Sequence, residues 1–264
     1  MIKLITVQTD ASHEATLFII AGGPGLSSQT LRSLDLLKNS FRLIYLDFGG
    51  TGESRYTGKQ SYDEIVSHFV KTIEQNKSKK NFILGHSFGG VLAASVFLHS
   101  KIDGLICLSS PFTKESLVNA NENYNKYMNS ELKFAEAEWS KNQDDASFAN
   151  WLSSYGKMYF CNPEGKSLIL NDKVSSKYFK DNRLDASNKE YLLSSLKETG
   201  KMKIFICGKE DKLISPEFYK KDAELGGFEF YEVDNASHFV SFDQPEKVKQ
   251  IIEQSLINYK GKSL

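Results

Sequence analysis

Cysteine is scarce in this sequence, and its spacing excludes two kinds of site. The 264 residues contain three cysteines, an odd number with no CxxC pair. Cys107 and Cys207 stand inside apolar runs, where a free cysteine behaves as a small hydrophobic residue. We therefore expect neither a disulfide framework nor a zinc or other metal site.

An excess of charge of one sign is also absent, and so is a long hydrophobic run. Lysine and arginine number 33, as do aspartate and glutamate, whereas proteins that bind nucleic acid usually carry a basic surplus. The apolar run at residues 17–26 is about half as long as a membrane span, and residues 1–10 are not typical of a signal peptide. We expect a cytoplasmic protein of one domain, with no nucleic-acid or membrane partner.

Short apolar runs recur along the chain and predict a parallel sheet. They are continuously apolar rather than alternating, which is typical of strands buried on both faces. The seven runs are residues 4–8, 16–23, 41–50, 81–87, 104–110, 203–209 and 228–234. Segments with helical periodicity lie between or after them, among them 61–75, 90–99 and 245–256. This alternation predicts an α/β fold, a doubly wound, mostly parallel sheet with about seven strands.

The alternation breaks between residues 114 and 200. This part of the sequence has long amphipathic stretches and no convincing buried strand. It is too long for a connecting loop, because structureless loops beyond about 15 residues are uncommon. We therefore predict a helical lid (cap) at residues 114–200, inserted into an α/β core formed by residues 1–113 and 201–264.

A G-x-S-x-G motif at residues 85–89 carries the first sign of chemistry. The run NFIL leads into the motif and the small-residue segment GGVLAASVFL leads out of it. This context fits a serine on a sharp strand-to-helix turn, where side chains two residues on either side would clash. We predict that Ser87 is a nucleophile.

A serine hydroxyl needs a base to take its proton, and one of the five histidines is well placed. His238 follows the last predicted strand, so it lies at the carboxyl edge of the sheet, the same edge as Ser87. His68 and His99 fall on predicted helices, and His13 lies in an early polar turn. His86 lies within the motif and is expected to point away from the serine. We predict that His238 is the base.

The base in turn needs an acid that orients it. Asp211 follows the predicted strand at residues 203–209 and is our choice, with the adjacent Glu210 as the alternative. The resulting order Ser87, Asp211, His238 differs from the order in chymotrypsin-like and subtilisin-like proteases.

Glycine-rich turns supply the remaining candidates. The loop Ala21–Gly25 directly follows a predicted strand, and its backbone N–H groups are free to approach a substrate. We predict an oxyanion hole formed by the N–H groups of Gly23, or alternatively Gly22, and Phe88. Neither this loop nor residues 49–52 has the glycine and lysine spacing of a nucleotide-binding loop, so we expect no cofactor.

Together these motifs resemble the α/β-hydrolase fold. The loop GGPG at 22–25, with the spacing of Asp47, Gly50, Gly52 and Ser54, is most similar to the prolyl aminopeptidase (proline iminopeptidase) branch. The resemblance covers about residues 16–111 and 203–238. The sequence departs from that branch where Ala21 replaces a histidine and Phe48-Gly49 replaces Gln-Arg. The elbow Gly-His-Ser-Phe-Gly is the commoner form among esterases and lipases.

The resemblance implies a serine hydrolase that acts through an acyl-enzyme on a small ester, amide or short peptide. A prolyl aminopeptidase would bind the free amine of its substrate with lid carboxylates, for which Glu136 and Glu138 are candidates. Trp139 and Trp151 of the lid are candidates for the wall of the substrate pocket. Gly22 of the glycine-rich loop is a further candidate for substrate binding. The alternatives are a carboxylesterase, thioesterase or lactonase of the same fold, or a ligand-binding protein without catalysis.

Overall fold

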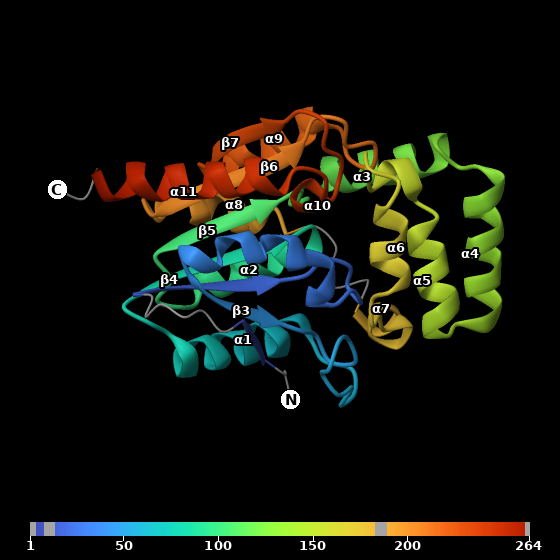
Figure 1. Ribbon diagram of the computed structural model, residues 1–264, viewed down its shortest axis with the longest axis horizontal. Helices are drawn as coiled ribbons and strands as arrows, with labels where there is room; N and C mark the ends of the chain where they lie inside the picture. Colours follow the sequence, from blue (N-terminus) through green and yellow to red (C-terminus); the bar gives the residue numbers. More distant parts are fainter. Residues whose placement is uncertain (1–3, 8–13, 183–188, 262–264) are drawn as a thin grey trace.

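One mixed sheet organises the molecule, in a computed structural model that describes residues 4–7, 14–182 and 189–261 (Figure 1). In this part of the chain the sheet has seven strands, in the order β1-β3-β2-β4-β5-β6-β7. β1 is antiparallel to β3, and every other neighbouring pair is parallel. The strands are β1 (Leu4–Val7), β2 (Ala15–Ile20), β3 (Arg42–Leu46), β4 (Lys80–His86), β5 (Gly104–Leu108), β6 (Met202–Gly208) and β7 (Glu229–Val233). The predicted mostly parallel sheet of about seven strands is confirmed.

Both faces are buried along β2 to β6, as the continuously apolar runs predict. The prediction is wrong for β7, where only Val233 is buried, because no further strand of the described chain pairs with its outer edge. Within β2, Phe18 and Ile20 enter one hydrophobic cluster, whereas Leu17 and Ile19 enter a second cluster on the opposite face. The first face is covered by α1 (Tyr62–Asn76), α2 (Phe88–Leu98), α8 (Tyr191–Glu198) and α9 (Pro216–Gly226). The second is covered by η1 (Ser28–Asn39) and α11 (Pro245–Gly261). The sheet is therefore doubly wound.

The 3₁₀ helix η1 is an element that the apolar-run analysis does not predict. Leu31, Leu34 and Leu37 are buried at a spacing of three residues, which fits the three residues per turn of a 3₁₀ helix rather than the α-helical period. The Ser27 side chain accepts a hydrogen bond from the Gln29 N–H and caps its start. The helix thereby covers the half of the sheet that carries β2 and β3.

The chain between β5 and β6 is helical, as predicted. Its helices, besides α8, are α3 (Lys114–Lys126), α4 (Ser130–Asn142), α5 (Asp145–Ser153), η2 (Gly156–Met158), α6 (Gly165–Leu170) and α7 (Ser176–Asn182). Figure 1 shows α4 to α7 gathered beyond one end of the sheet. α3 packs against α9, and α8 packs against α2 and α9, so both ends of the insertion contact the core. The division at residues 114 and 200 stays a prediction.

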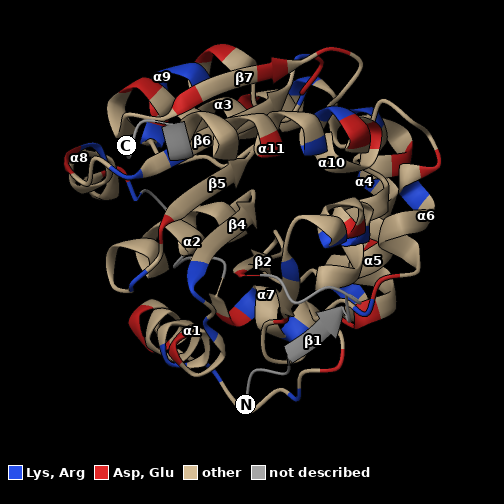
Figure 2. Ribbon diagram, turned by 60° about the vertical axis from the view of Figure 1, so that its left-hand side comes forward, with Lys and Arg blue, Asp and Glu red and all other residues tan. Residues whose placement is uncertain are grey.

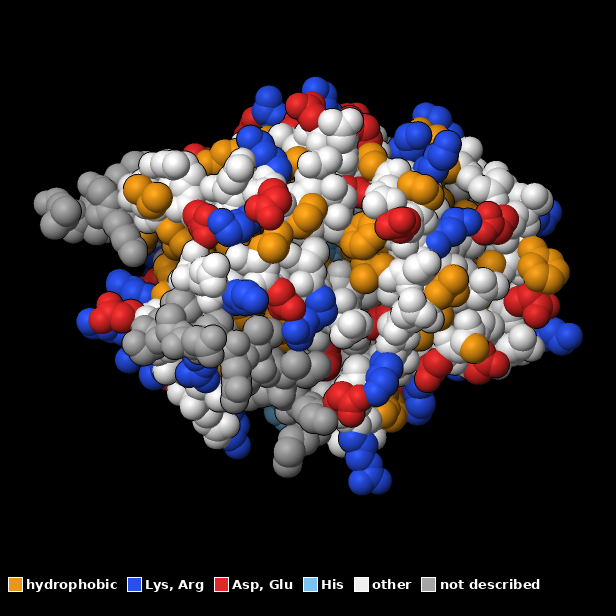
Figure 3. Space-filling model, viewed as in Figure 1, with side chains coloured by type: hydrophobic (Ala, Val, Ile, Leu, Met, Phe, Trp, Pro, Cys, Tyr) orange, Lys and Arg blue, Asp and Glu red, His pale blue; other side chains and the backbone are white. Residues whose placement is uncertain are grey.

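The face of the molecule seen in Figure 3 carries both signs of charge. Lys, Arg, Asp and Glu alternate along the helices in Figure 2, and Figure 3 shows them interspersed with hydrophobic side chains on one face. Among the described helices, none has the length and apolar character needed to cross a membrane.

Candidate active site

Ser87 occupies a strained turn between β4 and α2. Its backbone has φ 51° and ψ −125°, a left-handed φ that costs free energy for any residue except glycine. The turn is possible because its neighbours lack side chains. A Cβ on Gly85 would lie 2.1 Å from the carbonyl oxygen of Gly89, and one on Gly89 would lie 2.1 Å from that of Ala21. The glycines of the motif are therefore required by the packing of the turn.

Asp211 and His238 lie together at the carboxyl edge of the sheet. The Asp211 Oδ1 atom accepts hydrogen bonds from the N–H groups of Leu213 (2.8 Å) and Ile214 (3.1 Å). Its Oδ2 atom lies 3.0 Å from Nδ1 of His238. Because a carboxylate only accepts, we assign the proton to Nδ1, which leaves Nε2 of His238 as the basic nitrogen. Glu210 is directed elsewhere and accepts from the Ala236 N–H.

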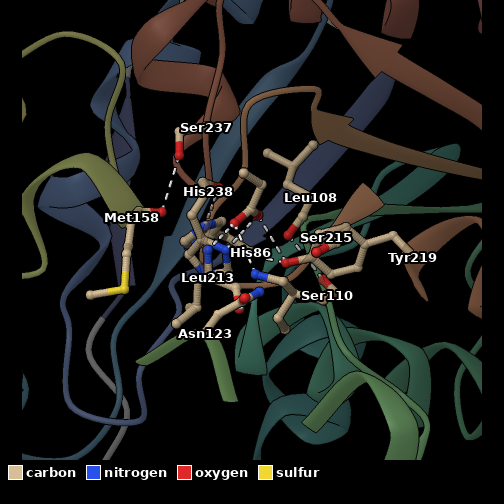
Figure 4. A network of polar contacts seen from close by, with 12 residues as sticks. His86, Leu108, Ser110, Asn123, Met158, Leu213, Ser215, Tyr219, Ser237 and His238 are labelled. Carbon is tan, nitrogen blue, oxygen red and sulfur yellow. Dashed lines mark hydrogen bonds and ion pairs between the residues drawn. The ribbon is translucent and has the colours of Figure 1, made fainter. Parts of the chain in front are cut away.

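The Tyr219 hydroxyl is a partner of this pair that the sequence analysis did not predict. It donates to Oδ2 of Asp211 at 3.0 Å and lies 3.2 Å from Nδ1 of His238. Figure 4 shows Tyr219, Leu213 and His238 converging from different segments. Tyr219 is fully buried, and burial raises the pKa of its hydroxyl well above the usual range. The tyrosine therefore stays a neutral donor to the carboxylate.

Ser87 is related to this pair indirectly, through the cavity that it lines together with Tyr159. Among the described residues, no hydrogen bond joins the Ser87 hydroxyl to His238. The Tyr159 ring lines the same cavity as Ser87 and stacks on the His238 imidazole, with ring centroids 5.4 Å apart. Hydrogen bonds between a nucleophile and its base often tighten only when substrate binds. The catalytic roles of Ser87, Asp211 and His238 stay a prediction.

The predicted oxyanion donors lie beside Ser87. Gly23 and Phe88 both line the Ser87 cavity, whereas Gly22 does not. Phe88 is the first residue of α2, so its N–H has no acceptor within the helix. Gly23 has φ 116°, and a Cβ there would lie 2.5 Å from the Gly25 nitrogen. The loop conformation therefore requires glycine at this position.

The cavity that Ser87 lines, called here the acyl cavity, is small and apolar. Its volume is about 200 Å³. Besides Ser87, Gly23 and Phe88, its walls are Pro24, Leu26, Val91, Pro111, Leu117, Ala120, Trp151, Leu152, Tyr155, Tyr159, Phe179, Leu213 and Ile214. No carboxylate belongs to this lining, within the part of the chain that the structure describes.

Only one of the four predicted substrate-binding residues of the lid lines the acyl cavity, among the described residues. Trp151 lines the acyl cavity, but Trp139 does not; it stacks behind Trp151 with ring centroids 4.4 Å apart. Glu136 lies beside the Tyr124 hydroxyl, and Glu138 accepts a long hydrogen bond from Asn142. Neither glutamate lines the acyl cavity. In the described residues no group of three or more histidine, cysteine or acidic side chains is placed to hold a metal ion.

The strand order, the elbow and the acid–base pair are together the features of one known fold. A family model described as "alpha/beta hydrolase fold" matches residues 15–245. The chain belongs to the alpha/beta hydrolase fold family. The expected resemblance to this superfamily, and the expectation of a hydrolase, are confirmed.

Individual relatives of this α/β hydrolase differ in their activities. A probable 1-acylglycerol-3-phosphate O-acyltransferase from Oryza sativa subsp. japonica is 34% identical over 101 residues, which are 35% of this chain and only 24% of that protein. A carboxylesterase structure from Nitrososphaera gargenis has a TM-score of 0.74 at 16% identity, covering 99% of this chain and 96% of that one. A proline iminopeptidase-related protein from Thermus thermophilus has a TM-score of 0.73 at 20% identity, covering 98% and 94%. The two structures show the fold alone.

His86 holds a position in this α/β hydrolase that the sequence analysis did not foresee. Its Nε2 lies 3.0 Å from the carbonyl oxygen of His238, and its ring packs 4.4 Å from that of Phe239. A Cβ on Gly22 would lie 2.8 Å from its Nδ1. Burial, and second the nearby His238, lower the pKa of His86 well below its usual value. His86 is therefore neutral, and it lies against both the loop that carries His238 and the loop Ala21–Gly25.

The signal for His86 and Tyr219 is not present in the sequence taken alone. Tyr219 stands in the amphipathic helix α9, where a buried tyrosine has the pattern of an ordinary core residue. His86 is the variable position of the G-x-S-x-G motif. The role of His86 depends on a contact with a segment more than 100 residues away. The role of Tyr219 depends on how α9 packs against the loop that carries Asp211.

Proposed function

We propose that this α/β hydrolase is a serine hydrolase that cleaves esters of small apolar acyl groups. One observation carries the proposal: Ser87, on a strained elbow, opens on an apolar cavity of about 200 Å³ beside the Asp211–His238 pair. This volume is below the roughly 300–1,000 Å³ that is typical of sites for larger ligands. A short acyl chain fits such a space.

The proposed mechanism is a covalent one in two steps. His238 Nε2 takes the Ser87 proton as the hydroxyl oxygen attacks the substrate carbonyl, and Asp211 stabilises the imidazolium through Nδ1–H. The Gly23 and Phe88 N–H groups donate to the oxyanion. Collapse of the tetrahedral intermediate breaks the ester bond, and His238 gives the proton to the departing alcohol. Water then hydrolyses the acyl-enzyme by the same route, which releases the acid and restores Ser87.

The composition of the acyl cavity favours an ester over an N-terminal prolyl peptide. A prolyl substrate brings a free ammonium group, and burying that charge without a partner costs several kcal/mol. Glu136 and Glu138, the predicted amine ligands, lie outside the cavity lining. A proline iminopeptidase-like activity is the second candidate, because the GGPG loop at 22–25 resembles that branch. A thioester or lactone would use the same groups as an ester.

The test compares kcat/KM for p-nitrophenyl butyrate and prolyl-p-nitroanilide. The proposal predicts turnover of the butyrate that disappears in Ser87→Ala and persists in the control Ser140→Ala, an exposed serine on α4. Stronger turnover of the anilide would favour the peptidase. A folded protein that turns over neither compound would instead fit a ligand-binding protein without catalysis.

A further inference from the structure

A second cavity lies next to the acyl cavity, between the start of α4 and the segment that contains η2. Its volume is about 460 Å³. Tyr155 belongs to the lining of both cavities. Two adjacent residues lie on either side, since Lys212 lines the second cavity and Leu213 lines the acyl cavity. Tyr155 also stacks on Tyr159, with ring centroids 4.4 Å apart, and Tyr159 stacks on His238. The two cavities therefore share the wall formed by Tyr155, which is linked to the proposed base through Tyr159.

This second cavity, called here the lysine cavity, combines an apolar surface with positive charge. Tyr127, Met158 and Phe160 supply apolar surface. Of the described residues, three lysines line it, and Glu131 is the single acid in the lining. The side chain of Lys166 is paired with Glu131 at 2.6 Å. The lining thus carries a surplus of two positive charges, on Lys157 and Lys212.

Those two lysines have no carboxylate partner among the described residues. Neither forms an ion pair there, and the Lys212 ammonium lies over the Tyr127 ring, 5.9 Å from its centroid. Three carboxylates outside the lining act on its Cys161 with their negative charge and are hydrogen-bonded to other groups. Asp243 accepts from the N–H groups of Cys161, Asn162 and Ser237. Asp211 accepts from four donors and Glu210 from the Ala236 N–H.

We propose that the lysine cavity binds the leaving group of the substrate, and that this leaving group has an apolar body with an anionic substituent, a phosphate or a carboxylate. The inference rests on the proposed function, because it assumes that an acyl group is cleaved at Ser87. The acyl chain fills the apolar cavity, the alcohol extends past Tyr155, and its anion meets the ammonium groups of Lys157 and Lys212. Their attraction is strongest at low salt, because both lysines are exposed.

Two esters that differ by one carboxylate test this assignment. They are p-nitrophenyl butyrate and 3-carboxy-4-nitrophenyl butyrate, which deliver the same acyl group from similar leaving phenols. We expect the ratio of kcat/KM for the carboxylated to the neutral ester to fall at least tenfold in Lys157→Gln/Lys212→Gln, mainly through KM. The matched control Lys133→Gln/Lys141→Gln removes two exposed lysines of α4 and keeps the wild-type ratio. Added NaCl should lower the ratio in the wild type.

A binding measurement makes the result independent of turnover and identifies the anion. Calorimetric titration of benzoate, phenyl phosphate and the neutral benzyl alcohol into the wild type and the lysine variant separates carboxylate from phosphate. We expect at least one anion to bind tenfold more weakly to the variant, with benzyl alcohol unchanged. Anion binding and ester ratios that are both insensitive to the lysines would overturn the inference and leave the proposed function intact. Lysine-dependent anion binding without hydrolysis of either ester would instead overturn the proposed function.

Discussion

The His86 imidazole donates a hydrogen bond from Nε2 to the main-chain carbonyl of His238, over 3.0 Å. The donor direction follows because a carbonyl oxygen only accepts. Both residues are buried. The bond joins the residue directly before the proposed nucleophile to the proposed base itself. It therefore fastens the loop that carries His238 to the turn that carries Ser87.

Replacement of His86 should lower activity through the position of the base. In His86→Phe the carbonyl of His238 loses its donor, and we expect kcat to fall at least tenfold with little change in KM. A buried carbonyl left without a donor costs about 1–3 kcal/mol of stability. His86→Gln, which keeps an N–H at a similar reach, should recover much of kcat. Steady-state kinetics on a folded sample checks this, and a Phe variant with the wild-type kcat would refute the positioning role.

The strain at Ser87 predicts opposite effects on stability and activity. Glycine adopts a φ of 51° without the cost of about 1–2 kcal/mol that other residues incur. We expect Ser87→Gly to raise the free energy of unfolding by about 1 kcal/mol while it abolishes ester turnover. Ser87→Ala keeps the Cβ and should abolish turnover without this gain. Urea unfolding of the two variants, compared with the wild type, measures the difference; equal stabilities would contradict a strained elbow.

Most of the fold is predictable from the sequence because burial on both faces leaves a local signature. Each of the seven apolar runs overlaps one strand, and the G-x-S-x-G motif lies at the β4–α2 turn. Gly85 is required for a local reason, because a Cβ there would meet the backbone of Gly89 and Gly90, whereas a Cβ on Gly89 would meet the distant backbone of Ile20 and Ala21.

What depends on contacts between distant segments is not predictable in this way. Trp139 and Trp151 are both tryptophans of neighbouring helices, yet only Trp151 of the two lines the acyl cavity. The Trp139 indole stacks behind it and donates a hydrogen bond to Ser176. The same holds for Tyr219, which looks like a core residue of α9 until Asp211 is placed beside it. Tertiary packing sets the orientation of a side chain in an inserted helical segment, and the hydrophobic periodicity of the sequence does not predict it.

Asp172 joins the helical segment between β5 and β6 to the start of η1 and predicts a pH dependence of stability. Its carboxylate accepts from the Ser27 N–H at 2.9 Å and from the Ser27 hydroxyl, and nearby the Ser175 N–H donates to the carbonyl of Gly25. The pKa of Asp172 is raised from 3.8 to about 6, chiefly by burial and also by the Asp47 carboxylate, with the Ser27 hydrogen bonds opposing the shift.

The sign follows from which state holds the proton. Between about pH 3.8 and pH 6 the folded state keeps the Asp172 proton and the unfolded state has lost it, so stability from this group falls as pH rises through that window. We expect wild type to lose about 3 kcal/mol relative to Asp172→Asn between pH 3.5 and pH 7. Urea unfolding at both pH values measures this difference; parallel pH curves for the two proteins would show that Asp172 has no raised pKa.

The acyl cavity predicts a preference for short chains. We expect kcat/KM for p-nitrophenyl esters to be highest for acetate to hexanoate and at least tenfold lower for laurate, because a cavity of about 200 Å³ lacks room for twelve carbons. Ala120→Leu adds volume to its wall and should shift the optimum toward acetate. Leu225→Ala, at an exposed position of α9 outside this lining, serves as control. An unchanged chain-length profile in Ala120→Leu would show that the acyl chain binds elsewhere.

The most direct test of the account is to trap the acyl-enzyme. The protein is mixed with p-nitrophenyl butyrate, quenched in acid within the first turnovers, digested and analysed by mass spectrometry. The account predicts a butyryl group on the peptide that contains Ser87, absent in Ser87→Ala and strongly reduced in His238→Ala. Ester hydrolysis by a folded wild type that leaves the acyl group on another residue, or hydrolysis that survives in Ser87→Ala, would contradict it.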